Sequence, residues 1–167
     1  MIHIHSHSGI YTLEAEQVLP ISREAAWDFF SAPENLGNIT PPYMGFKITS
    51  RPDDRMYAGQ VITYSIGLLP GIRSPWVTEI THVQEGRFFV DEQRFGPYAF
   101  WHHQHWFKSR GDATHMTDRV SYKLPFGPFG RLLHPFIKRQ LIRVFTYRYD
   151  TLARLFPAPA TSDIRSS

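Results

Sequence analysis

The segment WHHQHWF, residues 101–107, contains three histidines, two tryptophans and a phenylalanine. An imidazole side chain can bind a metal ion, transfer a proton near neutral pH or hold the polar end of a ligand. Alternate side chains of a β-strand point to opposite faces, so His103 and His105 share one face while His102 takes the other. The chemistry open to His103 and His105 therefore depends on the neighbouring strand.

In the stretch THMTDRVSYKL one face is mostly apolar and the other is polar, a pattern that predicts a second strand. A hairpin at RGDA joins it to the first strand. The apolar face of the second strand also carries Asp118. Matching the apolar faces of the two strands across the hairpin places His105 opposite Asp118, and a slip of one residue would break this match. In the same register His103 lies opposite Val120. We therefore predict a His105–Asp118 pair on the inner face of the sheet.

Three interpretations of this pair stay open. In the first, His103 and His105 are metal ligands, and Asp118 or Glu92 completes the site. In the second, Asp118 orients His105 as a general base that removes a proton next to a carbonyl group. In the third, the pair is a satisfied polar group in a pocket wall, because buried polar side chains need partners in any protein. We favour the third, and we expect neither a metal nor a cofactor.

Arg148 is a charged residue that the helical pattern places in the middle of an apolar stripe. A buried charge is costly unless it is paired. Its partner would be an acidic group on a ligand or a protein carboxylate, unless the guanidinium reaches the wet rim of a cavity. The candidate carboxylates are Asp118, Asp91 and Glu92. Asp91 and Glu92 lie on opposite faces of one strand, and which of them faces the pocket stays open.

Composition excludes several functional classes. The 167 residues suit one globular domain, and the aromatic share of 15% suits a chain that encloses a cavity. The absence of cysteine excludes disulfides, thiolate nucleophiles and cysteine-bound metals. A net charge of +3 is too small to indicate a nucleic-acid partner, and no apolar run reaches the ~18 residues of a membrane span. Without a signal peptide, we expect a cytoplasmic protein with no stable membrane insertion.

The chain divides into a β-rich part and a helical end. Residues 9–19 alternate as a strand, and we expect two short helices after it, at 23–31 and around PENLGN. Six further strands follow, separated by Gly, Pro and Asp turns that indicate an antiparallel meander. Residues 131–156 then change to a helical period. The apolar stripe of this helix comprises Leu133, Ile137, Leu141, Val144, Leu152 and Leu155.

This order of elements predicts an α+β fold, in which a curved antiparallel sheet wraps around a long C-terminal helix. The sheet needs its apolar face covered, and the last helix is the long amphipathic element that can cover it. A curved sheet on one helix leaves a space between them. We expect a single domain over residues 9–156, with flexible termini at 1–8 and 157–167.

Several stretches resemble the SRPBCC superfamily, whose helix-grip fold is shared by START lipid-transfer domains, polyketide cyclases and the birch-pollen allergen. The stretches that carry this resemblance are FFSAPENLGNITPP, VDEQRFGPYAFWHHQHWF, DRVSYKLPFGPFG and VFTYR. The resemblance spans residues 11–156 and is strongest to a bacterial branch of cyclase/dehydrase-like proteins. The resemblance implies a pocket for an apolar ligand under the C-terminal helix, but no single activity, because the fold carries transporters, sensors and enzymes.

We therefore expect the protein to bind an apolar small molecule, lipid-like or polyketide-like, between the sheet and the helix. The alternative is a polyketide cyclase or dehydratase-type enzyme that uses His105 and Asp118 in the same cavity. A third class is a partner-binding module with a collapsed core, and a cavity of ~300 Å³ or more would favour a ligand. The expected ligand-binding residues are Tyr64, Trp76, Trp101, His103, His105, Asp118, Tyr122 and Arg148.

The outer face of the histidine strand raises the question of self-association. Phe100 and Trp106 fall on the face of His102, away from the expected cavity. They would form an exposed aromatic patch, which neighbouring side chains cover in part or which serves as a homodimer interface. A homodimer therefore stays open, whereas no nucleic-acid partner is expected.

Overall fold

The computed structural model describes residues 2–51, 53–69 and 71–158. Within these residues eight strands form one antiparallel sheet, in the order β1-β2-β8-β7-β6-β5-β4-β3. The elements in chain order are β1 (Ile2–His7), β2 (Ile10–Leu19), α1 (Arg23–Phe30), the 3-10 helices η1 (Pro33–Leu36) and η2 (Pro42–Met44), β3 (Lys47–Ile48), β4 (Val61–Leu69), β5 (Ile72–Gln84), β6 (Phe88–Phe95), β7 (Phe100–Arg110), β8 (Ala113–Lys123) and α2 (Gly127–Leu155).

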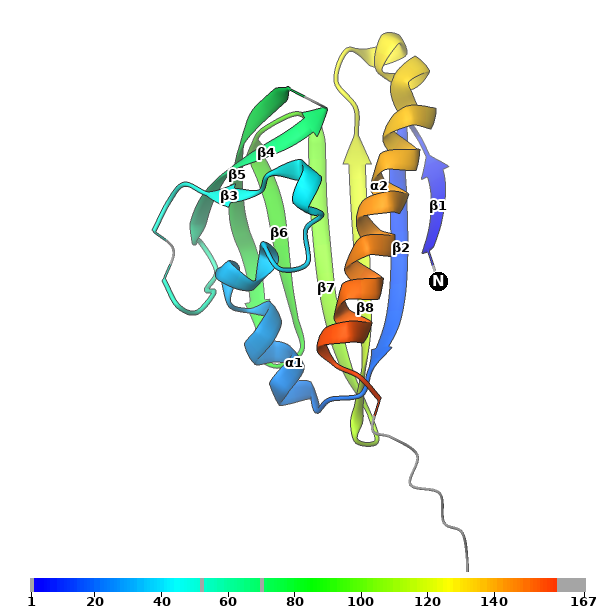
Figure 1. Cartoon of the computed structure of the whole chain (residues 1–167). Coiled ribbons are helices and arrows are strands. Elements are labelled where there is room, and N and C mark those ends of the chain that lie inside the picture. Colours follow the sequence, from blue (N-terminus) through cyan, green and yellow to red (C-terminus); the bar gives the residue numbers. More distant parts are fainter. Residues whose placement is uncertain (1, 52, 70, 159–167) are drawn as a thin grey trace, which may run out of the picture.

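The sheet curves around the long helix α2, as Figure 1 shows. In that view α2 stands in front of β2 and β8, and it contacts β1 and β2. The shorter helix α1 lies at the lower end of the sheet and contacts β7 and β8. The predicted α+β arrangement of a curved antiparallel sheet and a C-terminal helix is confirmed. No helix among the described residues is both long and apolar enough to cross a membrane.

The register of the histidine hairpin is confirmed. β7 pairs with β8 so that His105 faces Asp118 and His103 faces Val120. The connection is a two-residue turn in which Gly111 has a φ of 61°. Glycine adopts this left-handed conformation without the steric cost that other residues meet. The tight turn and the matched apolar faces together fix which side chains meet across the two strands.

The N-terminal segment is a strand over residues 2–7, whereas the sequence predicts a flexible terminus over residues 1–8. Ile2–His7 form the edge strand β1, which pairs with β2 from Ile2 opposite Ala15 to His7 opposite Ile10. The isoleucines of this strand pack against the core, and its histidines are exposed. Isoleucine and histidine alternate in β1, so the strand has one apolar face. Pairing with β2 turns this face toward the core. At the other terminus, residues 159–167 of the predicted flexible segment lie outside the described residues.

The short helices follow their sequence signals. Ser22 caps α1, because its hydroxyl accepts a hydrogen bond of 3.2 Å from the backbone N–H of Ala25. The second expected helix is the single 3-10 turn η1, which begins at Pro33. Both elements precede the β meander and close the lower part of the space between the sheet and α2.

Helix α2 is longer than the 131–156 segment that the sequence predicts, and its buried stripe is shorter. It begins at Gly127, and its first turns project beyond the end of the sheet in Figure 1. Leu133 is 59% exposed, and Leu155 in the last turn is 46% exposed, so neither belongs to the buried stripe that the sequence predicts. The buried residues of the helix are Gly130, Leu141, Phe145, Arg148, Thr151 and Leu152.

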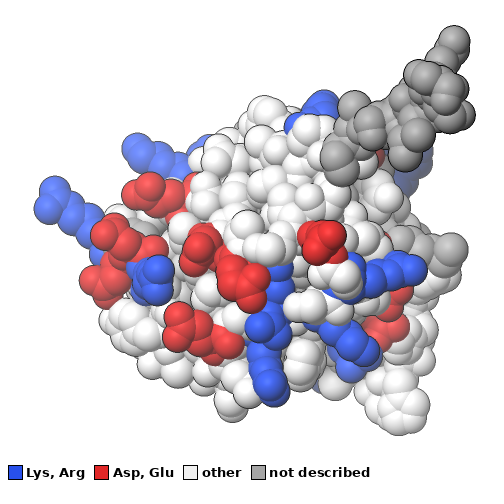
Figure 2. All heavy atoms as spheres, turned by 90° about the horizontal axis from the view of Figure 1, so that it is seen from below, with Lys and Arg blue, Asp and Glu red and all other residues white. Residues whose placement is uncertain are grey.

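The surface charges have both signs on the face that Figure 2 shows, where acidic and basic side chains alternate over the lower end of the molecule. On the outer face of β7, Trp106 is 42% exposed and stacks on Phe88 with ring centroids 4.5 Å apart. The predicted aromatic patch with Phe100 is thus partly covered by a neighbouring ring. A homodimer through this patch stays a prediction.

Candidate functional site

A cavity of about 170 Å³ lies between the curved sheet, the segment from α1 to η2 and helix α2. Its wall is mostly aromatic and aliphatic, with side chains such as Phe30, Ile62, Tyr64, Trp76 and Leu141. The volume is smaller than the ~300 Å³ expected of a site for a drug-sized ligand. It is close to that of the ~150 Å³ apolar cavity that holds benzene. The space therefore fits a compact molecule.

One part of the wall is polar. β6 contributes Asp91, β7 contributes His103 and His105, and α2 contributes Arg148. Asp91 pairs directly with His103 in the register of β6 and β7, so both side chains point to the inner face of the sheet. Behind the histidines, Asp118 of β8 completes a cluster that spans three neighbouring strands and the helix. We call these five side chains the polar cluster.

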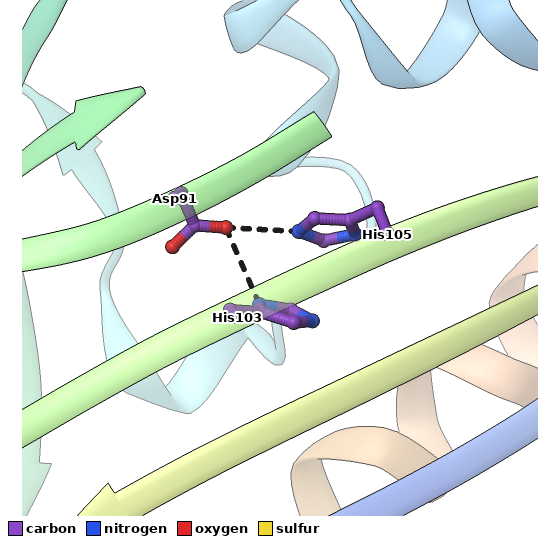
Figure 3. A group of neighbouring side chains, drawn as sticks. All are labelled: Asp91, His103 and His105. Atoms are coloured by element: carbon purple, nitrogen blue, oxygen red, sulfur yellow. Dashed lines mark hydrogen bonds and ion pairs between the residues drawn. The ribbon is translucent and has the colours of Figure 1, made fainter. Parts of the chain in front are cut away.

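Each imidazole of the polar cluster lies between two carboxylates. His103 Nε2 is 3.0 Å from Asp118 Oδ1, and its Nδ1 is 3.4 Å from Asp91 Oδ2. His105 Nε2 is 2.9 Å from Asp91 Oδ2, and its Nδ1 is 2.8 Å from Asp118 Oδ1. The last contact is short but lacks the direction of a hydrogen bond, so His105 Nδ1 has no hydrogen-bond partner among the described residues. Figure 3 shows both imidazoles beside Asp91.

Arg148 is buried, and its guanidinium Nη1 lies 3.4 Å from Asp118 Oδ2. The guanidinium also lies over the ring of Phe145, 5.0 Å from its centroid. Of the partners that the sequence left open, the protein carboxylate Asp118 is the one in contact. This ion pair fixes Asp118 behind the histidines and places a positive charge at the cavity wall.

The charges of the polar cluster act on one another through a poorly solvated space. Burial opposes ionisation of Asp118, but Arg148 and the histidines hold the pKa of this carboxyl well below its usual value. Burial likewise opposes ionisation of Asp91, whose pKa the histidines nevertheless lower. Burial and the neighbouring His105 lower the pKa of His103. Burial acts in the same direction on His105, but the two carboxylates raise its pKa. Both carboxylates are therefore ionised at neutral pH.

Six of the eight predicted ligand-binding residues line the cavity: Tyr64, Trp76, Trp101, His103, His105 and Arg148. Asp118 contacts both histidines from behind and lies outside the wall of this cavity. Tyr122 does not line the cavity, in contrast to the prediction. It is fully buried, and its hydroxyl lies 3.1 Å from His134 Nε2. The rings of Tyr98 and Trp101 pack beside it, with centroids 5.9 and 6.3 Å away. These two rings line the cavity where Tyr122 does not.

The sequence left the choice between Asp91 and Glu92 open, and the structure places Asp91 at the cavity. Glu92 points to the other face, where its carboxylate lies 2.8 Å from His102 Nδ1 and 3.1 Å from Arg94 Nη1. The ligand atoms of Asp91, His103 and His105 all lie within 4.8 Å of one another, a spacing that could hold a metal ion. The candidate third metal ligand beside the two histidines is thus Asp91, whereas the sequence offered Asp118 or Glu92.

Comparisons with known proteins identify the fold. No protein-family model matches the chain, and no curated protein sequence does. Among solved structures, protein CV1439 from Chromobacterium violaceum superposes with a TM-score of 0.66 at 13% identity, over 89% of this chain and 99% of that one. Ara h 8.0201, a birch-pollen-allergen-like protein, superposes with a TM-score of 0.58 at 13% identity, over 87% and 99%. The chain has the helix-grip fold.

The helix-grip fold, which the resemblance to the SRPBCC superfamily implies, is thereby confirmed. A nucleoside-diphosphate sugar epimerase from Corynebacterium glutamicum contains a similar unit, with a TM-score of 0.60 at 22% identity. That match covers 84% of this chain and 28% of the epimerase chain. Identities this low show a shared fold, and the cavity under α2 lies where the helix-grip resemblance implies a ligand pocket.

Proposed function

We propose that the protein binds a compact apolar molecule with one hydroxyl or carbonyl group in the cavity under α2. The observation that carries this proposal is the contrast within the wall, which is mostly aromatic and aliphatic but gathers its charged and imidazole side chains in one place, at Asp91, His103, His105 and Arg148. The other polar residues of the wall are Asn35, Thr40, Thr78 and Gln140. An apolar wall drives binding by removing hydrocarbon surface from water, while a few convergent polar groups set the orientation of the ligand. The similarity to Ara h 8.0201 supports the helix-grip fold as the scaffold for such a pocket.

The size of the cavity narrows the ligand class. About 170 Å³ fits a single substituted aromatic ring or a short branched chain. A lipid-like or polyketide-like ligand, as the resemblance implies, would need α2 or the η1–η2 segment to move away from the sheet. The third class that the sequence left open, a partner-binding module with a collapsed core, stays an alternative, because the volume lies below the ~300 Å³ that would favour a ligand.

The chemistry of the polar cluster narrows the polar group of the ligand. Asp91 is an acceptor, whereas Arg148 is a donor. A hydroxyl group can donate to the first and accept from the second, and a carbonyl group can accept from Arg148 or an imidazole N–H.

A titration with matched probes tests this proposal. We expect p-cresol to bind at least about tenfold more tightly than toluene, because one hydrogen bond to a charged buried group contributes ~1.5–3 kcal/mol. Benzylamine, which has a similar size but no hydroxyl or carbonyl group, is the charged comparison probe. Two-dimensional NMR of the labelled protein measures the affinity and shows which signals shift. Shifts confined to residues away from the cavity, or equal affinity for all three probes, would contradict the proposal.

A second candidate function is an enzyme of the cyclase or dehydratase type. The observation in its favour is the position of His105, which faces the cavity and contacts carboxylates on both sides. An imidazole held in this way is suited to move a proton next to a ligand carbonyl. Deuterium exchange next to the carbonyl of acetophenone would reveal such a reaction, and a binding protein would leave the ketone unlabelled.

A further inference from the structure

We propose that Asp91, His103 and His105 together bind one divalent transition-metal ion on the wall of the cavity. Each side chain offers one ligand atom, and the three atoms lie within 4.8 Å of one another. All three residues line the cavity, so the remaining coordination positions open into it. The sequence favoured a pocket wall over a metal because the third ligand that it offered, Asp118 or Glu92, was unproven, whereas the structure brings Asp91 beside both histidines. Metal binding needs no small molecule and is independent of the proposed function.

The polar cluster has fewer N–H donors than nitrogen–carboxylate contacts, which favours a cation between Asp91 and the imidazoles. Two neutral imidazoles have one N–H each, whereas four nitrogen atoms lie within 3.4 Å of a carboxylate oxygen. A contact without an N–H sets a nitrogen lone pair against a carboxylate, which is costly in a buried site. A cation removes this conflict. The nitrogens that face Asp91 then bind it through their lone pairs, and those that face Asp118 keep their protons.

The nitrogens that face Asp118 supply the outer support that histidine ligands require. A metal-bound histidine almost always directs its other N–H to a carboxylate or carbonyl, which fixes the tautomer and the ring orientation. Asp118 Oδ1 lies 3.0 Å from His103 Nε2 and 2.8 Å from His105 Nδ1. Its other oxygen, Oδ2, lies 3.4 Å from Arg148 Nη1. Asp118 thus forms a hydrogen bond with His103 and a close charge contact with His105 that lacks the direction of a hydrogen bond. The ion pair with Arg148 keeps that carboxylate in place.

The distances between candidate ligand atoms suit a transition metal. Bonds of about 2.0–2.2 Å to nitrogen and oxygen place neighbouring ligand atoms roughly 3.0–3.4 Å apart around one ion. Asp91 Oδ2 lies 2.9 Å from His105 Nε2 and 3.4 Å from His103 Nδ1. Two imidazoles and one carboxylate favour Zn²⁺, Fe²⁺ or Co²⁺, whereas Mg²⁺ and Ca²⁺ prefer oxygen ligands.

The charges of the site also predict the next ligand. Asp91 and Asp118 supply two negative charges, and Arg148 supplies one positive charge. A bound divalent ion therefore gives the site a net charge of one positive unit. A bound hydroxide or an anionic ligand oxygen would neutralise it. In the metal-loaded protein we therefore expect p-cresol to bind as its phenolate, an expectation that does rest on the proposed function.

Titration of the metal-free protein with Co²⁺ and Zn²⁺ tests the site. The exposed histidines of β1 could bind metal adventitiously, so the titration uses a variant in which His3, His5 and His7 are replaced by Asn. We expect one ion per chain by calorimetry, with visible absorption of bound Co²⁺ and paramagnetic shifts of the His103 and His105 NMR signals. These shifts locate the ion directly, even if ligand variants fail to fold.

Substitutions in the same background separate ligands from neighbours. We expect His103→Ala and Asp91→Ala to weaken binding by more than about 100-fold, and Asp118→Asn to weaken it by about 10–100-fold as an outer partner. His102→Ala is the matched control, because His102 lies on the opposite face beside Glu92, and it should leave the affinity unchanged. Absence of saturable binding, or binding that survives His103→Ala in the folded protein, would overturn the proposal.

Discussion

Replacing Arg148 with leucine is expected to lower the free energy of unfolding by about 3–5 kcal/mol at neutral pH. Arg148 is 8% exposed, and its guanidinium lies 3.4 Å from the carboxylate of Asp118, which is 5% exposed. Leucine removes the positive charge that holds the pKa of Asp118 low and leaves a buried carboxylate beside Asp91. Urea unfolding in the presence of a chelator measures the loss, because a bound metal would otherwise stabilise the folded state.

The matched control for Arg148 is Arg143, an exposed arginine on the same helix. Arg143→Leu should change the free energy of unfolding by less than about 0.5 kcal/mol. An equally small effect of Arg148→Leu would show that the ion pair with Asp118 does not stabilise the fold. A stable Arg148→Leu protein that no longer retains an acidic ligand would instead assign Arg148 to ligand anchoring, one of the alternatives that its sequence position left open.

Filling the cavity with Val144→Trp is expected to abolish the binding of small apolar molecules. Val144 lies on α2 and lines the cavity, so the indole ring would occupy space that a ligand needs. A volume of about 170 Å³ leaves little room for a ligand beside an added indole. We expect the affinity for p-cresol to fall by at least about tenfold, which corresponds to ~1.4 kcal/mol. NMR titration and the unfolding free energy of the same sample give both quantities.

Ile142→Trp provides the control for cavity filling. Ile142 is 36% exposed on the same helix and does not belong to the cavity wall, so its replacement should leave p-cresol binding unchanged. If Val144→Trp binds p-cresol as tightly as the natural protein while it stays folded, the ligand lies elsewhere. If both variants lose binding, the effect is a general loss of structure.

The sequence predicts the register of the histidine hairpin because two independent constraints agree there. The turn at Gly111 is short, and the apolar faces of its strands match in one register, so His105 must face Asp118. The same argument could not decide between Asp91 and Glu92. Phenylalanines occur on both faces of β6, and the pairing of β6 with β5 contains register shifts. Only the pairing of Asp91 with His103 settles which carboxylate faces the cavity.

Long-range packing explains the errors of the sequence analysis. Strand periodicity puts Tyr122 on the inner face, but it cannot show that Tyr98 and Trp101 take the cavity wall beside it. The apolar period of α2 predicts Leu141 and Leu152 as buried, which they are, whereas Leu133 is 59% exposed and it is the next residue, His134, that stacks on Tyr11 of β2. The strand Ile2–His7 forms because β2 offers it an edge, which the local sequence alone does not reveal.

The central claim is that the cavity under α2 holds a small molecule, and native mass spectrometry of the protein purified from its own host tests it most directly. The natural protein is expected to carry a non-covalent mass on the scale of one substituted aromatic ring, which unfolding releases. The Val144→Trp variant should carry none. A natural protein that always appears at its bare polypeptide mass, with an optional metal ion alone, or a retained mass that Val144→Trp does not displace, would contradict the claim.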